Sequence, residues 1–173
     1  MSGTPTFHNT RTRLTVLIAI VGFCIGCDLG TKRLAVDALH DGPPMSFLGG
    51  LVKLVYAENV GAFGSLGAAW PAWVKTITFI LIPVAVLLMI AVRLVRQADL
   101  PKLEFYGLAL VVGSAGNLVE RIQQGYVVDF MWLGIGFLHT NIFNVADLAI
   151  VAGVILLFIS GMKKTPEKTA LPA

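Results

Sequence analysis

The sequence predicts a small, mainly α-helical integral membrane protein with four transmembrane helices and a small β platform outside the membrane. The first supporting observation is composition: of 173 residues, 56% are hydrophobic and 13% are charged, against roughly 25% charged in a soluble domain. The others are four apolar stretches of nearly spanning length and an uneven distribution of Lys and Arg. The composition excludes a disordered segment and disfavours a soluble domain. Two cysteines cannot form a disulfide scaffold.

The predicted helices cover approximately residues 14–35, 73–92, 105–121 and 145–162. A spanning helix needs about 20 mainly apolar residues, and fewer where polar ends reach the interface. Pro83 is tolerable inside the second helix because neighbouring groups in a membrane protein satisfy the freed carbonyl. The basic tail and first apolar stretch also fit a cleavable signal peptide, but three further spans favour a segment that stays in the membrane.

The distribution of charge predicts that both termini are cytoplasmic. Cytoplasmic segments carry an excess of Lys and Arg. Eight basic residues fall in the tails 1–13 and 163–173 and in the connection between the second and third helices, and four fall on the other side. The net charge of +3 then reflects topology and does not indicate nucleic-acid binding. No repeat or linker divides the chain, so we expect one membrane domain over residues 1–173.

The outer segment, approximately residues 37–70, is too interrupted for a span and predicts the β platform. Residues 47–56 are rich in β-branched and aromatic types and contain glycines, which is typical of a strand or hairpin. Gly61, Gly64 and Gly67 interrupt the part that follows, so we expect turns and a short strand there. The platform is therefore expected between the first and second helices.

Two polar pairs lie within reach of the membrane, where ionisable groups are costly. Asp28 and Lys32 are four residues apart on one helix and can pair; a structural ion pair is the favoured interpretation. Asn117 and Arg121 also share a helix face. Asn117 alone could bond a neighbouring helix and Arg121 alone could reach lipid phosphate, but as a pair they suit a substrate backbone or carboxylate.

Two carboxylates, Asp129 and Asp147, carry the clearest chemical prediction. Asp147 could simply cap the fourth helix together with Asn144, and Asp129 could be an ordinary loop acid. Antiparallel third and fourth helices would bring both to one depth, however. Two carboxylates about 3 Å apart cannot both ionise readily. One can then take a proton from water while the other polarises a peptide carbonyl, which is aspartic-protease chemistry without a metal or cofactor.

Five segments of the chain resemble motifs of the bacterial lipoprotein signal peptidases, the type II signal peptidase family. They occur in one order and cover most of the sequence between Asp28 and about Ile150. The segments are Asp28 to Lys32, Asn59 to Gly64, Gly116 to Arg121, Gly125 to Phe130 and Phe143 to Asp147.

The resemblance implies an intramembrane aspartyl endopeptidase that removes the signal peptide of diacylglyceryl-modified prolipoproteins by cutting before the lipidated cysteine. It implies prolipoproteins and membrane lipids as partners of a multi-pass monomer in the bacterial cytoplasmic membrane, with its active site near the outer face. By resemblance Asp129 and Asp147 are catalytic, and Asp28 and Lys32 shape the fold. The remaining matched residues are expected to bind substrate: Asn59 and Gly61 on the outer loop, and Asn117, Arg121 and Asn144 at the site.

Three departures from the family pattern leave the predicted catalytic pair intact. Glu120 stands where the family usually has Asp, Leu148 replaces a small or hydroxyl residue, and the Asn59 motif is one small residue shorter. They affect the expected loop geometry, inhibitor sensitivity and substrate preference. The alternatives to a peptidase are a catalytically silent paralogue that binds lipoproteins and a small proton or ion transporter that uses the same carboxylates.

Overall fold

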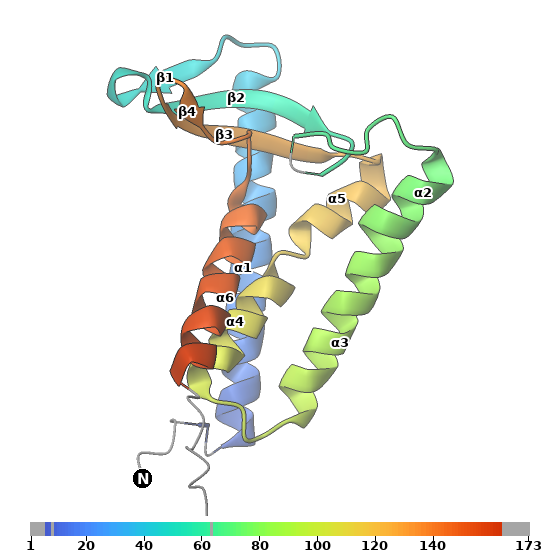
Figure 1. The fold of residues 1–173 in the computed structure, drawn as a ribbon, viewed down its shortest axis with the longest axis vertical. Coiled ribbons are helices and arrows are strands. Elements are labelled where there is room, and N and C mark those ends of the chain that lie inside the picture. The colour runs from blue at the N-terminus through green and yellow to red at the C-terminus, as the bar shows by residue number, and fades with distance from the viewer. Residues whose placement is uncertain (1–5, 8, 63, 164–173) are drawn as a thin grey trace, which may run out of the picture.

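The computed structural model describes residues 6–163 except 8 and 63. Most of the two predicted tails, with Lys164 and Lys168, lies outside the described residues. Long helices run side by side, and a twisted sheet lies across one end of them (Figure 1). Among the described residues, three helices are long and apolar enough to cross a membrane: Thr10–Leu39 (α1), Ala72–Arg96 and Val145–Lys163 (α6).

The first two of these helices are longer than predicted. The α1 helix begins after Asn9, whose side chain accepts a hydrogen bond of 2.8 Å from the backbone nitrogen of Arg11. The helix Ala72–Arg96 consists of α2 (Ala72–Thr76), a π-helical turn (Ile77–Leu81) and α3 (Ile82–Arg96). The wider turn lies beside Pro83, where a regular helix would lose a hydrogen bond.

The prediction of one continuous helix over 105–121 is wrong. This part of the chain forms α4 (Lys102–Gly113) and α5 (Gly116–Gln124). Gly and Ser are weak helix formers, and the Ser114 hydroxyl bonds back to the Val111 carbonyl at 2.7 Å, which favours a break at this point. Figure 1 shows that α5 leaves the direction of α4 and leans towards α2 and the π-helical turn.

The sheet has four antiparallel strands in the order β1 (Met45–Phe47), β2 (Val52–Asn59), β3 (Val127–Ile135) and β4 (Leu138–His139). A short helical turn, Leu48–Gly50, joins β1 to β2. The prediction that the whole platform lies between the first and second helices was incomplete. Two of its strands, β3 and β4, come after α5 in the sequence. The strand β2 needs a hydrogen-bonding partner on each edge, and β3 supplies one of them, with Ala57 opposite Asp129.

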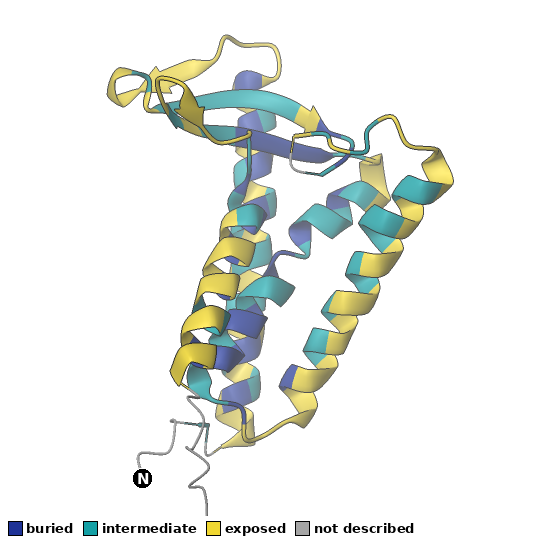
Figure 2. Cartoon of the chain, viewed as in Figure 1, coloured by how far each residue is buried: buried dark blue, intermediate teal, exposed yellow. Residues whose placement is uncertain are grey.

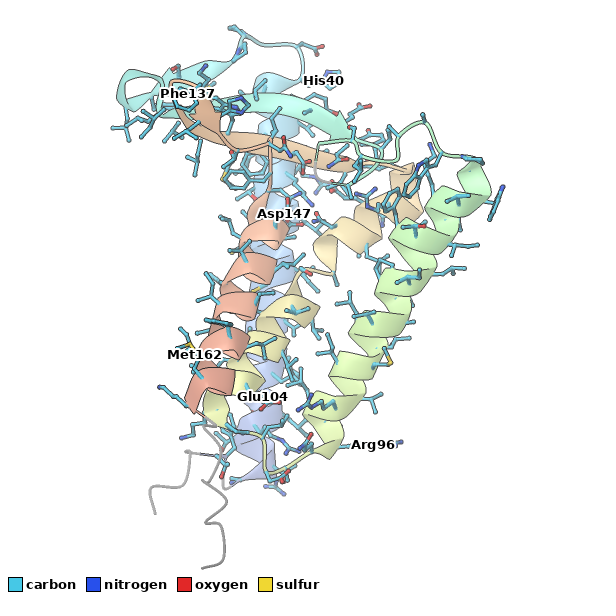
Figure 3. All side chains as sticks on the ribbon, in the orientation of Figure 1. His40, Arg96, Glu104, Phe137, Asp147 and Met162 are labelled. Carbon is cyan, nitrogen blue, oxygen red and sulfur yellow. The ribbon has the colours of Figure 1, made fainter. Side chains whose placement is uncertain are left out.

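Exposed and buried residues divide the helices into two kinds of surface. Buried residues lie where α1, α4 and α6 meet, whereas the outer faces are exposed (Figure 2). Phe23 on α1 and Phe158 on α6 are 72% and 69% exposed, which suits lipid and not water. The tip of the sheet also carries an apolar residue, Phe137, far from Asp147 (Figure 3). These surfaces indicate a membrane protein.

Glycines allow a close contact between α4 and α6. A Cβ atom on Gly107 of α4 would lie 2.8 Å from the Gly153 carbonyl oxygen, and one on Gly153 of α6 would lie 2.7 Å from the Gly107 carbonyl oxygen. Only a residue without a side chain allows this approach, as is common between membrane helices. The crossing fixes the position of α6, which carries Asp147 at its first turn.

Candidate active site

A buried ionic cluster joins α1 to α5 and α6. The Lys32 Nζ atom lies 2.7 Å from Asp28 Oδ2 and 2.8 Å from Glu120 Oε2, and it donates to Asn117 Oδ1 at 2.6 Å. The remaining Asp28 oxygen accepts from the backbone nitrogen of Ala146 at 2.8 Å, in the first turn of α6. Lys32 is 2% exposed. The structure thus places the predicted Asp28–Lys32 pair in contact and adds three partners that sequence reasoning missed: Glu120, Asn117 and the backbone of Ala146.

Two residues of α5, Gly116 and Glu120, lie against this cluster. A Cβ atom on Gly116 would lie 2.2 Å from Asp28 Oδ2, so any other residue would displace the carboxylate. Glu120 reaches Lys32 and also accepts from the Val128 backbone nitrogen at 3.2 Å. The glutamate therefore connects the cluster to β3. The only sequence signal for Glu120 was that it stands where the family usually has Asp.

Asp129 projects from β3 and is held by two side-chain amides. Its Oδ2 accepts from Asn59 Nδ2 at 2.8 Å and its Oδ1 accepts from Asn144 Nδ2 at 2.6 Å. Burial raises the pKa of Asp129 to about 6, and the charge of Asp147 acts in the same direction, whereas the two amides lower it. A carboxyl group with this pKa exchanges its proton near neutral pH.

Asp147 lies in the first turn of α6 and is also held by amides. Its Oδ1 accepts from Asn117 Nδ2 at 3.0 Å, and its Oδ2 accepts from the backbone nitrogen of Asn144 at 3.1 Å. In return, Asn144 Oδ1 accepts from the Asp147 backbone nitrogen at 3.1 Å, a reciprocal capping arrangement. Asn144 therefore caps α6 and contacts Asp129 with the same side chain, so capping and a role at the carboxylate pair are compatible.

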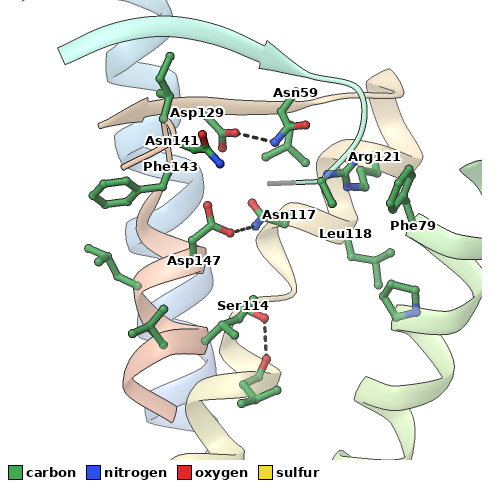
Figure 4. Close-up of a pocket in the computed structure, with 18 of the residues that line it drawn as sticks. Asn59, Phe79, Ser114, Asn117, Leu118, Arg121, Asp129, Asn141, Phe143 and Asp147 are labelled. Atoms are coloured by element: carbon green, nitrogen blue, oxygen red, sulfur yellow. Dashed lines mark hydrogen bonds between the residues drawn. The ribbon is translucent and has the colours of Figure 1, made fainter. Parts of the chain in front are cut away.

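Both carboxylates face one cavity of about 770 Å³ (Figure 4). Asp129 enters it from the sheet side and Asp147 from α6, while Asn117 and Arg121 approach from α5. Leu148, the residue after Asp147, also lines it. Much of the rest of the wall is apolar and comes from the second long helix, α4 and α6, including Phe79, Ile82, Pro83, Val86, Leu87, Val111, Ile150 and Val151.

Arg121 is engaged with the segment that follows β2. Its Nη2 atom donates to the Gly61 carbonyl oxygen, and its guanidinium lies 5.2 Å from the ring centre of Phe79. Asn59 Oδ1 accepts from the Gly61 nitrogen at 3.1 Å. A Cβ atom on Gly61 would lie 2.2 Å from the Leu66 carbonyl oxygen, so this tight turn requires glycine. The turn belongs to the motif that includes Phe63, which lies outside the described residues.

The structure also brings residues to the cavity that the sequence did not single out. Asn141 and Thr140 enter from the segment before α6, and Phe79 enters from the π-helical turn. Thr140 and Asn141 are polar and lie just before the Phe143 motif in the sequence, and this position could have identified Asn141 as a candidate. Nothing in the sequence indicates which way Phe79 points. No group of three or more His, Cys, Asp or Glu residues arranged for a metal ion occurs in the described part of the chain.

Comparisons with known proteins agree with this architecture. The family model of signal peptidase (SPase) II matches residues 20–163. The chain is similar to the lipoprotein signal peptidase of Photorhabdus laumondii, with 34% identity over 82% of this chain and 84% of the relative. It is 37% identical to that of Rhodococcus jostii, over 87% of this chain and 74% of the relative.

Among solved structures, a bacterial membrane enzyme superposes with a TM-score of 0.77 at 25% identity, covering 92% of this chain and 94% of the other. A second bacterial membrane enzyme superposes with a TM-score of 0.75 at 23% identity and shows the same fold. The family match extends from within α1 to the end of α6 and so includes both carboxylates and the cavity between them. The chain belongs to the signal peptidase II family.

Proposed function

We propose that this chain is an aspartic endopeptidase that removes signal peptides from diacylglyceryl-modified prolipoproteins by cleaving before the lipidated cysteine. Family membership supports a protease of prolipoproteins. The observation that carries the aspartic mechanism is the pair Asp129 and Asp147, which enter one cavity from two different elements and are held by neutral amides.

In the proposed reaction, the ionised carboxylate takes a proton from a water molecule, which attacks the peptide carbonyl. The protonated carboxyl donates a hydrogen bond to the carbonyl oxygen and stabilises the negative charge that develops there. Collapse of the tetrahedral intermediate breaks the C–N bond, and the leaving nitrogen receives the proton that the first carboxylate took from the water. The raised pKa of Asp129 supports this division because one proton can be retained by the pair near neutral pH.

The cavity walls support a signal peptide as substrate. Signal peptides contain an apolar stretch of 7–15 residues, and most of the lining side chains between the long helices are apolar. Asn117, Asn144 and Asn59 are proposed to hold the carboxylates and the substrate backbone. Arg121 and Gly61 are proposed to position the outer segment over the bound peptide, since they are already in contact with each other.

We further propose that the chain forms one multi-pass domain and crosses the bacterial cytoplasmic membrane four times. The pair α4 and α5 would form the third crossing, which places the sheet and both carboxylates at the outer face and both termini in the cytoplasm. The excess of Lys and Arg in alternate connections supports this orientation. We propose a monomer surrounded by membrane lipids, because one chain supplies both carboxylates and the amides that hold them.

The decisive experiment is cleavage of a diacylglyceryl-modified prolipoprotein by purified Asp129→Asn and Asp147→Asn variants. Each change keeps the side-chain shape but removes the proton exchange, so we expect a loss of at least about 10³-fold in cleavage rate. Asp41→Asn, at an exposed acid outside the cavity, should cleave at the wild-type rate.

The two alternatives give different results. Processing at the wild-type rate by either dyad variant would refute the aspartic mechanism. A wild-type protein that binds the substrate without cutting it would indicate a silent paralogue. Proton flux into proteoliposomes without cleavage would indicate a transporter.

A further inference from the structure

Phe79 is the middle residue of the π-helical turn Ile77–Leu81. No other π-helical turn occurs among the residues that the structure describes. Such a turn fits an extra residue into a helix, which changes the direction of its side chains, and it is frequently found at functional sites. In this protein the turn carries the Phe79 ring to the wall of the cavity that Asp129 and Asp147 face (Figure 4).

The ring of Phe79 is held by an aromatic neighbour from the outer segment. Trp70 stacks on it with 5.8 Å between ring centres and 1° between ring planes. Gly67 permits this packing, because a Cβ atom there would lie 2.9 Å from Trp70 Cε3 and 3.1 Å from Phe79 Cζ. The packing of the outer segment therefore fixes the orientation of the Phe79 ring.

The Arg121 guanidinium lies over the same ring, 5.2 Å from its centre. The face of an aromatic ring carries negative charge and attracts a cation, more strongly where water is excluded. In the described part of the chain, the guanidinium donates one hydrogen bond, to the Gly61 carbonyl oxygen. Because a guanidinium has several N–H donors, others remain available to a bound molecule.

We propose that Phe79 is a positioning residue, whose ring orients the Arg121 guanidinium over the cavity. In this orientation one N–H group holds the turn at Gly61, and others can donate to a carbonyl oxygen of the bound signal peptide. The inference rests on the proposed function and assigns to it a residue that does not itself react.

The ring is needed because two carboxylates compete for the same cation. Asp129 and Asp147 face the cavity that Arg121 also lines. Arginine has a long and flexible side chain, so a guanidinium without the ring could turn and pair with either carboxylate. Contact with Phe79 favours the observed orientation, in which no ion pair joins Arg121 to an acid of the described residues.

The alternative is that Phe79 only fills the cavity wall, and the test separates the charge of the ring face from the volume of the side chain. A meta-difluorinated phenylalanine at residue 79 keeps the ring shape and the hydrogen at Cζ, which faces Gly67, but withdraws negative charge from the ring face. Phe79→Leu removes the ring and keeps an apolar side chain. We expect kcat/KM for a diacylglyceryl-modified prolipoprotein to fall about twofold in the fluorinated protein and about fivefold in Phe79→Leu.

Two comparisons control for other effects of these changes. Leu81→Ala alters an exposed residue of the same π-helical turn, outside the cavity, and should cleave at the wild-type rate. In an Arg121→Gln background, neither change at residue 79 should lower kcat/KM further, because no cation remains to be positioned. Where Arg121→Gln cleaves too slowly to be measured, the fluorinated protein decides alone.

Wild-type kcat/KM in the fluorinated protein would overturn the inference and assign Phe79 to the cavity wall. An equal loss with and without Arg121 would overturn it as well, and so would a fivefold loss in Leu81→Ala. These results would leave the proposed function intact. A wild-type protein that does not cleave the prolipoprotein would instead overturn the proposed function.

Discussion

Two groups of carboxylates lie within one region of this molecule but are held in different ways. Asp28 and Glu120 both pair with Lys32, at 2.7 and 2.8 Å. Asp129 and Asp147 are held by amide groups, and among the described residues neither has a cation within ion-pairing distance.

The two arrangements suit different roles: one group of carboxylates stabilises the fold, and the other is suited to acid–base chemistry. A carboxylate paired with a buried cation fixes the positions of the elements that carry it. A carboxylate held by neutral donors can keep or release a proton, which acid–base catalysis requires. Asn117 connects the two groups, because its oxygen accepts from Lys32 and its nitrogen donates to Asp147. The paired group therefore orients a donor that serves the unpaired one.

The largest effect on stability is expected from removing the cation of the paired group. Lys32→Met leaves Asp28 and Glu120 buried without compensation, which should cost about 3–5 kcal/mol. Thermal unfolding in detergent measures it. Arg33→Met, the neighbouring cation on the exposed face of α1, is the control and should change stability by at most about 0.5 kcal/mol. Equal melting temperatures for the two variants would contradict a supporting role for the Lys32 cluster.

The unpaired group should instead make stability depend on pH. Because the pKa of Asp129 is about 6 in the fold and 3.8 ordinarily, the folded state binds its proton more tightly than the unfolded chain. This contribution is complete below pH 4 and is lost as the pH rises through 6. The gap between the two values corresponds to at most about 3 kcal/mol.

Unfolding midpoints of the wild type and Asp129→Asn, measured from pH 4 to pH 8, test this expectation. The wild type should lose stability relative to the variant across the interval between pH 4 and 6. Asp41→Asn should follow the wild type throughout. Parallel curves for the wild type and Asp129→Asn would show that this carboxyl group has an ordinary pKa in the fold.

A smaller effect is expected at the contact between α5 and the paired group. Gly116→Ala places a methyl group against the Asp28 carboxylate and should cost about 1–3 kcal/mol. Gly26→Ala, on the same α1 helix as Asp28, meets nothing within 4 Å and should be neutral or stabilise by up to about 1 kcal/mol. The two melting temperatures should therefore move in different directions, and a common shift would mean that helix propensity alone decides both.

Much of the fold follows from local sequence features. The apolar stretches place three long helices, and the run of β-branched residues before Tyr56 places β2. The same reasoning failed at Ser114, because whether a weak helix former breaks a helix depends on the space that surrounds it. It also missed β3, since Val127 to Ile135 becomes a strand by pairing with β2, which is distant in the sequence.

For the candidate site, the residue types and the two carboxylates that stand out from an apolar background could be identified before any coordinates were known. The fold was needed to learn which of the acids share Lys32, which face a cavity, and that Asn144 contacts both Asp129 and Asp147. The physical reason is that these contacts join atoms from α1, β2, β3, α5 and α6. Periodicity and composition place each element along the chain, but hydrogen bonds between elements depend on where their side chains meet in space.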